Sequence, residues 1–304
     1  MCGAGEYSLS SAGFVGHCDA VRNAVPCPAV YHQRENFMNR MITRRLLPAL
    51  VLPLLLASSG CDIVTAEFRS EETAEWRKSY PLDASGRLEI SNVNGKIDVQ
   101  PAEGNRVEVV ALKKAKGPSS EAAKAALERI EIIDEASPGH VKIETKMNRP
   151  GGGMFNGGSL QVEYRVRVPA GAEVKVETVN GGIDITGLKG RVNAETTNGG
   201  VQARDIAGML VATTTNGGLD IDLAQMPEGG VKLECTNGGI KVRLPREAKA
   251  TISARISNGG ISADGLSIET IGDQSRRRLE GRLNGGGPRL DIEGTNGGIT
   301  LNGR

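Results

Sequence analysis

The chain has 304 residues, with 37 basic and 36 acidic side chains, 41 glycines and only 3% aromatic residues. A net charge near zero gives no overall attraction to nucleic acid or to a membrane surface, so no nucleic-acid partner is expected. So few aromatics disfavour a helical or sandwich core and favour a narrow interior of Val, Ile, Leu and Ala. The length of the chain allows one or two domains.

The first sixty residues indicate export. Residues 1–40 differ from the rest of the chain and suggest a mis-assigned start, with no defensible zinc spacing among their cysteines. From Met41 onward, two arginines precede a short apolar run and then small residues, which predicts a signal peptide at 41–60. Ser58-Ser59-Gly60-Cys61 resembles the lipobox of bacterial lipoproteins, although Ser58 stands where Leu is usual. We therefore expect lipidation of Cys61, which holds a protein on a membrane without spanning it; a plain signal peptide cut nearby is the alternative.

After the signal we expect three parts. Residues 61–81 form a tether and N-terminal cap, and residues 82–304 form a β-solenoid that is interrupted by an insertion at 104–170. Within the insertion, a helix is predicted from Pro118 to Ile130, capped by Ser119 or Ser120. The predicted strands of the insertion are 105–112, 131–134, 141–145 and 160–168, with a Gly-rich surface loop at 148–159.

The mature chain is organised by a phrase of the type Thr-x-Asn-Gly-Gly-Ile that recurs about every 20 residues in its centre. Its asparagines are Asn94, Asn180, Asn198, Asn216, Asn237, Asn258 and Asn296. Apolar residues stand six and four positions before each Asn, and three and five positions after it. This alternation predicts two half-buried strands joined by a tight bend in every copy.

Two architectures fit these strands. Asn-Gly between alternating strands is a hairpin signal, and it would place Val176 opposite Ile185 in an antiparallel meander. The alternative is an all-β, single-stranded β-helix or β-solenoid of about seven coils with one helix-bearing insertion. We favour the solenoid, because a hairpin turn explains the first Gly but not the recurring second one. Stacked coils would bring the seven asparagines into an amide ladder, and the coil of Asn296 would end the stack without a cap.

The residues indicate no enzyme and no cofactor or metal site. His140 has no nucleophile close in sequence, and Asp184, Asp220 and Asp222 are expected to point outward as part of a solvated face. Cys235 stands in the small corner position, where it is expected to be buried and unreactive. A carbohydrate-active β-helix enzyme remains an alternative, which the low aromatic content opposes.

Taken together, these motifs resemble a bacterial envelope family that is catalogued as adhesin-like from its shape. The resemblance rests on Val93-Asn94-Gly95-Lys96-Ile97, the helix-bearing insertion, Val168-Pro169-Ala170-Gly171 and the serial Asn-Gly-Gly coils. It implies a β-helix fold with largely unassigned activity and no catalytic residues. We therefore expect a binding or scaffold lipoprotein on an extracytoplasmic membrane face, with an envelope protein or glycan as partner and end-to-end self-association as an alternative.

Overall fold

The computed structural model describes residues 70–148, 159–272 and 274–304, all of them in the compact unit Asp62–Arg304. The predicted signal peptide, the lipidation site Cys61 and most of the Gly-rich loop 148–159 lie outside the described residues. Within the described ranges, no helix has both the length and the apolar character needed to cross a membrane.

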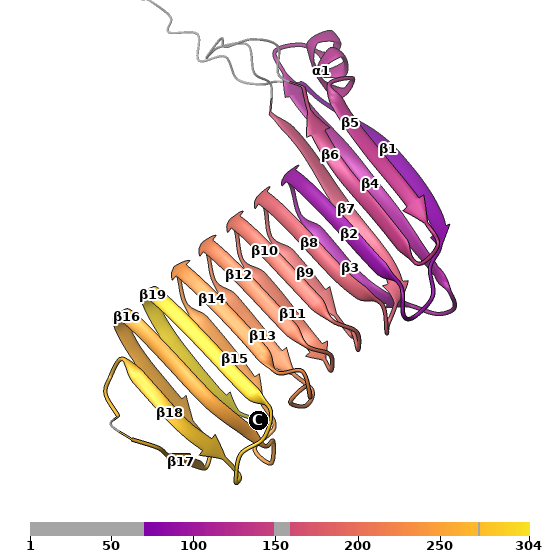
Figure 1. Cartoon of the computed structure of the whole chain (residues 1–304). Helices are drawn as coiled ribbons and strands as arrows, with labels where there is room; N and C mark the ends of the chain where they lie inside the picture. The colour runs from indigo at the N-terminus through magenta and orange to yellow at the C-terminus, as the bar shows by residue number, and fades with distance from the viewer. Residues whose placement is uncertain (1–69, 149–158, 273) are drawn as a thin grey trace, which may run out of the picture. The chain divides into compact units, whose positions relative to one another are not determined.

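The described chain is mostly β-structure with one short helix among its described residues (Figure 1). Its first part comprises β1 (Ser70–Pro81), β2 (Arg87–Asn94), β3 (Ile97–Ala102), β4 (Arg106–Gly117), α1 (Ser120–Leu127), β5 (Ile130–Ser137), β6 (His140–Met147) and β7 (Leu160–Pro169). The repeats form β8 (Glu173–Asn180), β9 (Ile183–Thr186), β10 (Val192–Asn198), β11 (Val201–Ile206), β12 (Leu210–Asn216), β13 (Leu219–Leu223), β14 (Val231–Asn237) and β15 (Ile240–Leu244). The last part comprises β16 (Ala250–Asp264), β17 (Ile268–Thr270), β18 (Arg278–Leu283) and β19 (Arg289–Gly303).

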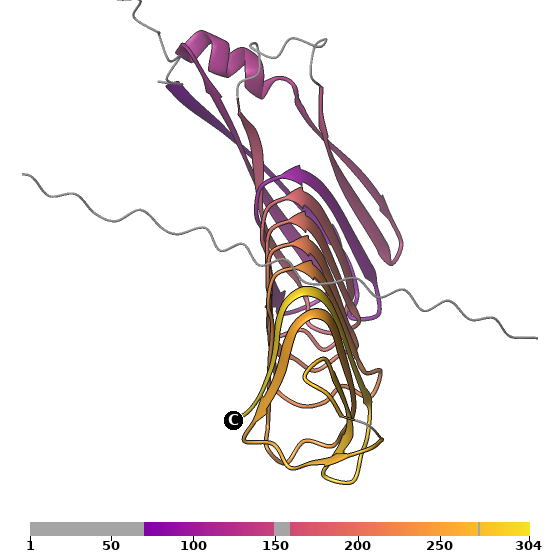
Figure 2. The same cartoon turned by 90° about the vertical axis from the view of Figure 1, so that its left-hand side faces the viewer.

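Each Asn-Gly-Gly repeat is one coil of a solenoid-like stack, not a hairpin. β8 pairs in parallel with β2 and β10, while β9 pairs in parallel with β3 and β11. Val176, Ala194 and Ala212 are therefore in-register neighbours from coil to coil. Figure 2 shows the coils nested one behind another, with all of them bending at the same side. The parallel stack confirms a solenoid-like arrangement of the repeats and rules out the meander.

The core is made of the four apolar columns. The columns six and four positions before the ladder asparagines are buried in every copy. The two columns after the asparagines are buried as well, except that Ile261 is half-buried and Ala263 is exposed. Both exceptions belong to the second half of β16. Among the described residues, this half pairs with β19 on one edge and with no strand on the other.

The predicted insertion contributes a coil of its own. β6 pairs in parallel with β2, and β7 pairs in parallel with β3, so together they stack on the first Asn-Gly coil. Antiparallel strands then close this end, with β5 on β6, β4 on β7 and β1 on β4. The N-cap of α1 is Ser119, whose side chain accepts a hydrogen bond from the Ala122 N–H. The helix is shorter than predicted, because Ile130 already begins β5.

Polar contacts tie β1 to β5 at this end. Lys78 Nζ lies 2.6 Å from Asp134 Oδ1, and the Tyr80 hydroxyl donates to Asp134 Oδ2 at 2.8 Å. Burial opposes ionisation of Asp134, but the hydrogen bonds from Lys78 and Tyr80 outweigh it and hold the pKa of this carboxyl below its usual value. Burial and the same hydrogen bond raise the pKa of Tyr80.

At the other end, the coils do not stack in the order of the sequence. β19 pairs with β14 and β15 on one side and with β16 on the other. The expectation that the coil of Asn296 ends the stack is therefore wrong, since that coil lies inside it and offers no free edge. The outermost coil is β16, whose first half is covered by the antiparallel strand β18.

Candidate functional site

The bends of the coils bring the seven ladder asparagines into one continuous row. Every Asn except Asn94 donates a side-chain N–H to the side-chain oxygen of a neighbouring Asn, over distances of 2.7 to 3.0 Å. The order along the row is Asn94, Asn180, Asn198, Asn216, Asn237, Asn296 and Asn258. At its first end, Asn94 donates to the Leu160 carbonyl at 3.1 Å, where β7 begins.

Directly inside this row, small side chains bind the bend of the preceding coil. Thr196 donates to the Gly181 carbonyl at 2.9 Å, and Thr214 donates to the Gly199 carbonyl at 2.8 Å. Cys235 occupies the same position, with its sulfur 3.3 Å from the Gly217 oxygen, and burial raises the pKa of its thiol. The buried Asn92 takes this position in the first coil and donates to the Val162 carbonyl at 2.9 Å. Asn92 was not predicted as a site residue, although it occupies the column of the inner threonines.

The two glycines of each bend differ in what they permit. A β-carbon added to Gly238 would lie 1.6 Å from the Gly217 oxygen, and the φ of Gly238 is 151°. At the following Gly239, the nearest atom to an added β-carbon is 3.7 Å away. The first glycine is therefore required by the close approach of coils, whereas the second mostly is not. The second glycine recurs in the solenoid, as predicted, but close approach of neighbouring coils does not explain it in most copies.

The position of the second glycine faces outward. This is seen in the first coil, where the position is occupied by Lys96, which is exposed. Residues just before the asparagines also face outward. We call this surface the corner ridge. Its residues are the ladder asparagines, the preceding Val93, Val179, Thr197, Thr215, Thr236, Ser257 and Thr295, and the outward Lys96, Gly182, Gly200, Gly218, Gly239, Gly260 and Gly298. Apart from Lys96 the ridge carries no charge, in a chain of which 24% of the residues are charged.

The candidate carboxylates of the sequence analysis lie on the strands after the bend, in ion pairs. Lys96 pairs with Asp184, and Arg243 lies 2.7 Å from Asp220. Asp222 lies 3.7 Å from Arg243 and 3.3 Å from Arg304. These pairs make a charge-balanced and partly exposed face.

The other residues singled out by sequence analysis do not assemble into a catalytic group. His140 lies 3.2 Å from Glu89 at the start of β6, apart from the corner ridge. Across the ranges that the structure covers, no group of three or more His, Cys, Asp or Glu side chains could hold a metal ion.

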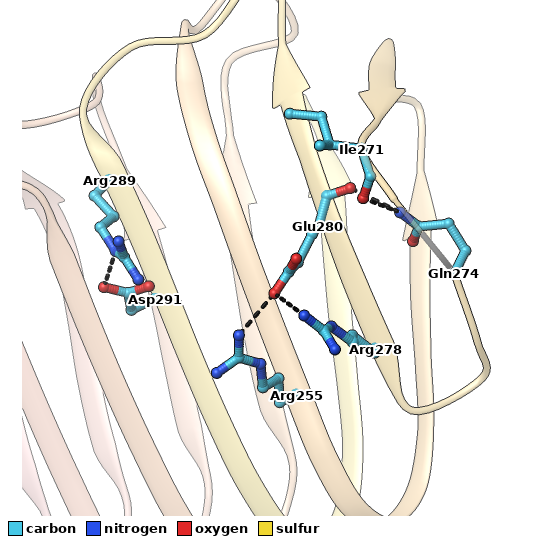
Figure 3. A network of polar contacts seen from close by, with 7 residues as sticks. All are labelled: Arg255, Ile271, Gln274, Arg278, Glu280, Arg289 and Asp291. Carbon is cyan, nitrogen blue, oxygen red and sulfur yellow. Dashed lines mark hydrogen bonds and ion pairs between the residues drawn. The ribbon is translucent and has the colours of Figure 1, made fainter. Parts of the chain in front are cut away.

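A separate polar network holds the outermost strands together (Figure 3). Glu280 of β18 accepts hydrogen bonds from Arg255 of β16 at 2.7 Å and from Arg278 at 3.0 Å, and these bonds lower its pKa. Gln274 donates to the Glu280 carbonyl at 2.7 Å, and Arg289 pairs with Asp291 on β19. The network joins the covering strand to the coil beneath it.

Comparison with known proteins gave a family model and several solved structures. The model described as Toastrack DUF4097 matches residues 77–302. A "putative cell adhesion protein" from Clostridium sporogenes is similar, with 15% identity and a TM-score of 0.47, over 77% of this chain and 100% of that one. A "putative adhesin" from Bacteroides fragilis has 8% identity and a TM-score of 0.34, over 75% and 97%. A search of curated proteins gave no match.

The solved structures are too distant to carry a functional argument. The family model, by contrast, covers most of the chain, including the first Asn-Gly coil, the helix-bearing segment and all the later coils. On this match, the chain belongs to the Toastrack DUF4097 family.

Proposed function

We propose that the protein is a non-enzymatic, lipid-anchored binding or scaffold module of the bacterial envelope, and that the corner ridge is its contact surface. The observation that carries this proposal is the row of outward glycines. At Gly182, Gly239, Gly260 and Gly298, an added β-carbon would have no neighbour closer than 3.5 Å. Packing does not demand glycine there, whereas glycine allows another molecule to approach the backbone closely.

The polar groups of the ridge suit a neutral, extended partner. Each asparagine inside the row uses one N–H and one oxygen lone pair within the ladder, and an amide has a second N–H to donate. The neighbouring threonine hydroxyls are exposed and recur at the spacing of adjacent strands, about 4.8 Å. An envelope glycan, which presents hydroxyl and amide groups along a chain, fits these donors and acceptors better than a charged polymer does.

Binding is tested with lysine substitutions at the second glycines. Gly182→Lys and Gly239→Lys place in later coils the residue that Lys96 already provides in the first. Both variants should fold, and their co-sedimentation with insoluble chitin, a neutral glycan that presents hydroxyl and amide groups along its chain, should fall at least about tenfold, because a lysine blocks close approach. Val211→Lys, on an outward strand position away from the ridge, is the matched control. Equal sedimentation of all three variants, or none by the wild type, argues against a glycan-binding ridge.

Anchoring is tested separately. Metabolic labelling with a palmitate analogue should modify the wild type and leave Cys61→Ala unlabelled and released from the membrane fraction. A labelled Cys61→Ala protein, or an unlabelled wild type, contradicts the lipoprotein assignment. The carbohydrate-active enzyme remains a weaker alternative, because the candidate carboxylates Asp184, Asp220 and Asp222 are all engaged with basic side chains.

A further inference from the structure

The last coil of the sequence fills a slot between two coils that precede it. β19 hydrogen-bonds to β14 and β15 in register, with Asn296 beside Asn237. Along its other edge, β19 pairs with β16 over residues 289–302, with Asn258 donating to Asn296 at 3.0 Å. Figure 1 shows β19 in yellow between the orange strands β14 and β16. β16 therefore joins the stack only through a strand with the pattern of β19, which must lie between β16 and β14.

Direct stacking of β16 on β14 would overpack the inner corner. The inner corner position is occupied by Cys235 in β14, by Gly294 in β19 and by Ile256 in β16. Ile256 leans over Gly294, so that a β-carbon added to Gly294 would lie 3.2 Å from both Ile256 Cγ1 and Cδ1. If β16 stacked directly on β14, Ile256 would meet the Cys235 side chain where it now meets a bare glycine. Without β19 the slot stays open for another strand of the same pattern.

The connection from β18 to β19 is a short hinge. Asn284, Gly285 and Gly286 have φ values of 50°, 85° and 90°, and Pro288 precedes the strand. The hinge is fixed by side-chain hydrogen bonds from Asn284 to the carbonyls of Arg246 and Ala248, at 2.7 and 2.8 Å. It must pass from the outer side of β16 to its inner side, because β18 and β19 flank that strand. A short hinge that needs positive φ values and must cross a neighbouring strand favours exchange of the following element between identical chains.

The covering strand is held independently of β19. β18 pairs with β16 through residues 278–283, and Glu280 binds Arg255 and Arg278 across this pair (Figure 3). The Arg277 and Arg276 carbonyls accept from the N–H groups of Ile256 and Ile261, where a next coil would otherwise accept. β16 and β18 can therefore stay together as one side of the slot while β19 leaves it.

We propose that the slot between β14/β15 and β16 is a strand-exchange site, and that its occupant in trans is residues 289–303 of a second copy of this chain. The exchanged strand makes the same parallel hydrogen bonds, continues the asparagine row and supplies the same Gly294 beneath Ile256. Two copies thus become linked through the same contacts that a single copy makes internally.

The test uses complementary single cysteines in the full-length chain. The five native cysteines are first replaced, Cys235 by threonine, as at Thr214 in the adjacent coil, and the others by serine. One variant carries Glu234→Cys and the other Glu293→Cys, which are in-register neighbours on β14 and β19. Adjacent strands are close enough for a disulfide. After the two variants are unfolded and refolded together, strand exchange places β19 of one chain beside β14 of the other and so raises the yield of a disulfide-linked dimer between the two variants.

The matched control mixes Glu293→Cys with Lys175→Cys, an outward position on a remote coil. We expect the interchain product of the neighbouring pair to exceed this control by roughly fivefold or more. Deletion of Gly285 and Gly286 should raise the dimer fraction in light scattering, whereas insertion of Gly-Ser residues after Gly286 should lower it. A neighbouring pair that cross-links no more than the control overturns the proposal, as does a folded hinge-deletion variant that remains monomeric. If the deletion variant does not fold, the full-length mixing experiment decides alone.

Discussion

The side chain of Ile256 lies over the bare α-carbon of Gly294, where the inner corner column changes from threonine and cysteine to glycine and then isoleucine. Neighbouring coils carry threonine or cysteine in this column, so the large Ile256 depends on a residue without a side chain beneath it. Gly294→Thr should therefore lower the free energy of unfolding by about 1–3 kcal/mol through overpacking. Chemical denaturation measures the change.

The double variant Gly294→Thr with Ile256→Thr should recover part of this loss, because it restores the threonine pairing of the earlier coils. A double-mutant cycle then gives a favourable coupling between the two threonines. Cys235→Thr, which introduces the residue present at this position in the adjacent coil of Thr214, is the control and should change stability little. If Gly294→Thr proves neutral, the size relationship between Ile256 and Gly294 is not what orders these coils.

The two glycines of one bend should differ sharply when each is replaced by alanine. Gly238→Ala places a β-carbon against the Gly217 carbonyl and requires an L-residue at a φ of 151°. It should cost about 2–4 kcal/mol of unfolding free energy, whereas Gly239→Ala should stay within about 1 kcal/mol. Thermal or urea unfolding of the two purified variants provides the comparison. Equal losses at both positions would contradict the steric distinction between the first and second glycine.

The position of an asparagine along the row should determine the cost of removing it. Asn216 donates to Asn198 and accepts from Asn237, so Asn216→Ala removes two side-chain hydrogen bonds. Asn258 makes one ladder bond, to Asn296. At about 0.5–1.5 kcal/mol per bond, Asn216→Ala should be about twice as destabilising as Asn258→Ala. A larger loss at Asn258 than at Asn216 in urea denaturation would show that the row is not additive in this way.

The Asp134 cluster should make stability depend on pH in acid. Because the folded-state pKa of Asp134 is depressed, its contribution is present above the unfolded value of about 4 and is lost as pH falls through the folded value. Asp134→Asn should flatten the pH dependence of the unfolding free energy below about pH 4. Urea denaturation across this range measures it, with Asp264→Asn as an exposed control. Parallel profiles for the wild type and Asp134→Asn would exclude a role for the cluster.

The repeat in the sequence was sufficient to predict several features of the fold. Alternation on both sides of each asparagine identified the buried columns, and the recurring Asn-Gly-Gly phrase favoured the parallel register that β8, β10 and β12 have. The helix cap at Ser119 and the buried Cys235 were also predictable from local chemistry. These features are local, or they repeat, so that a single chain contains the evidence for them several times.

The order of the coils could be decided only by the tertiary structure. Parallel coils of the same pattern pair equally well with any other coil, so the Asn-Gly-Gly phrase does not specify which coil lies next to which. Contacts across the stack decide this, above all Gly294 beneath Ile256, together with the covering strand β18. The same holds for β6 and β7, which form a coil without the phrase because their apolar faces match those of β2 and β3.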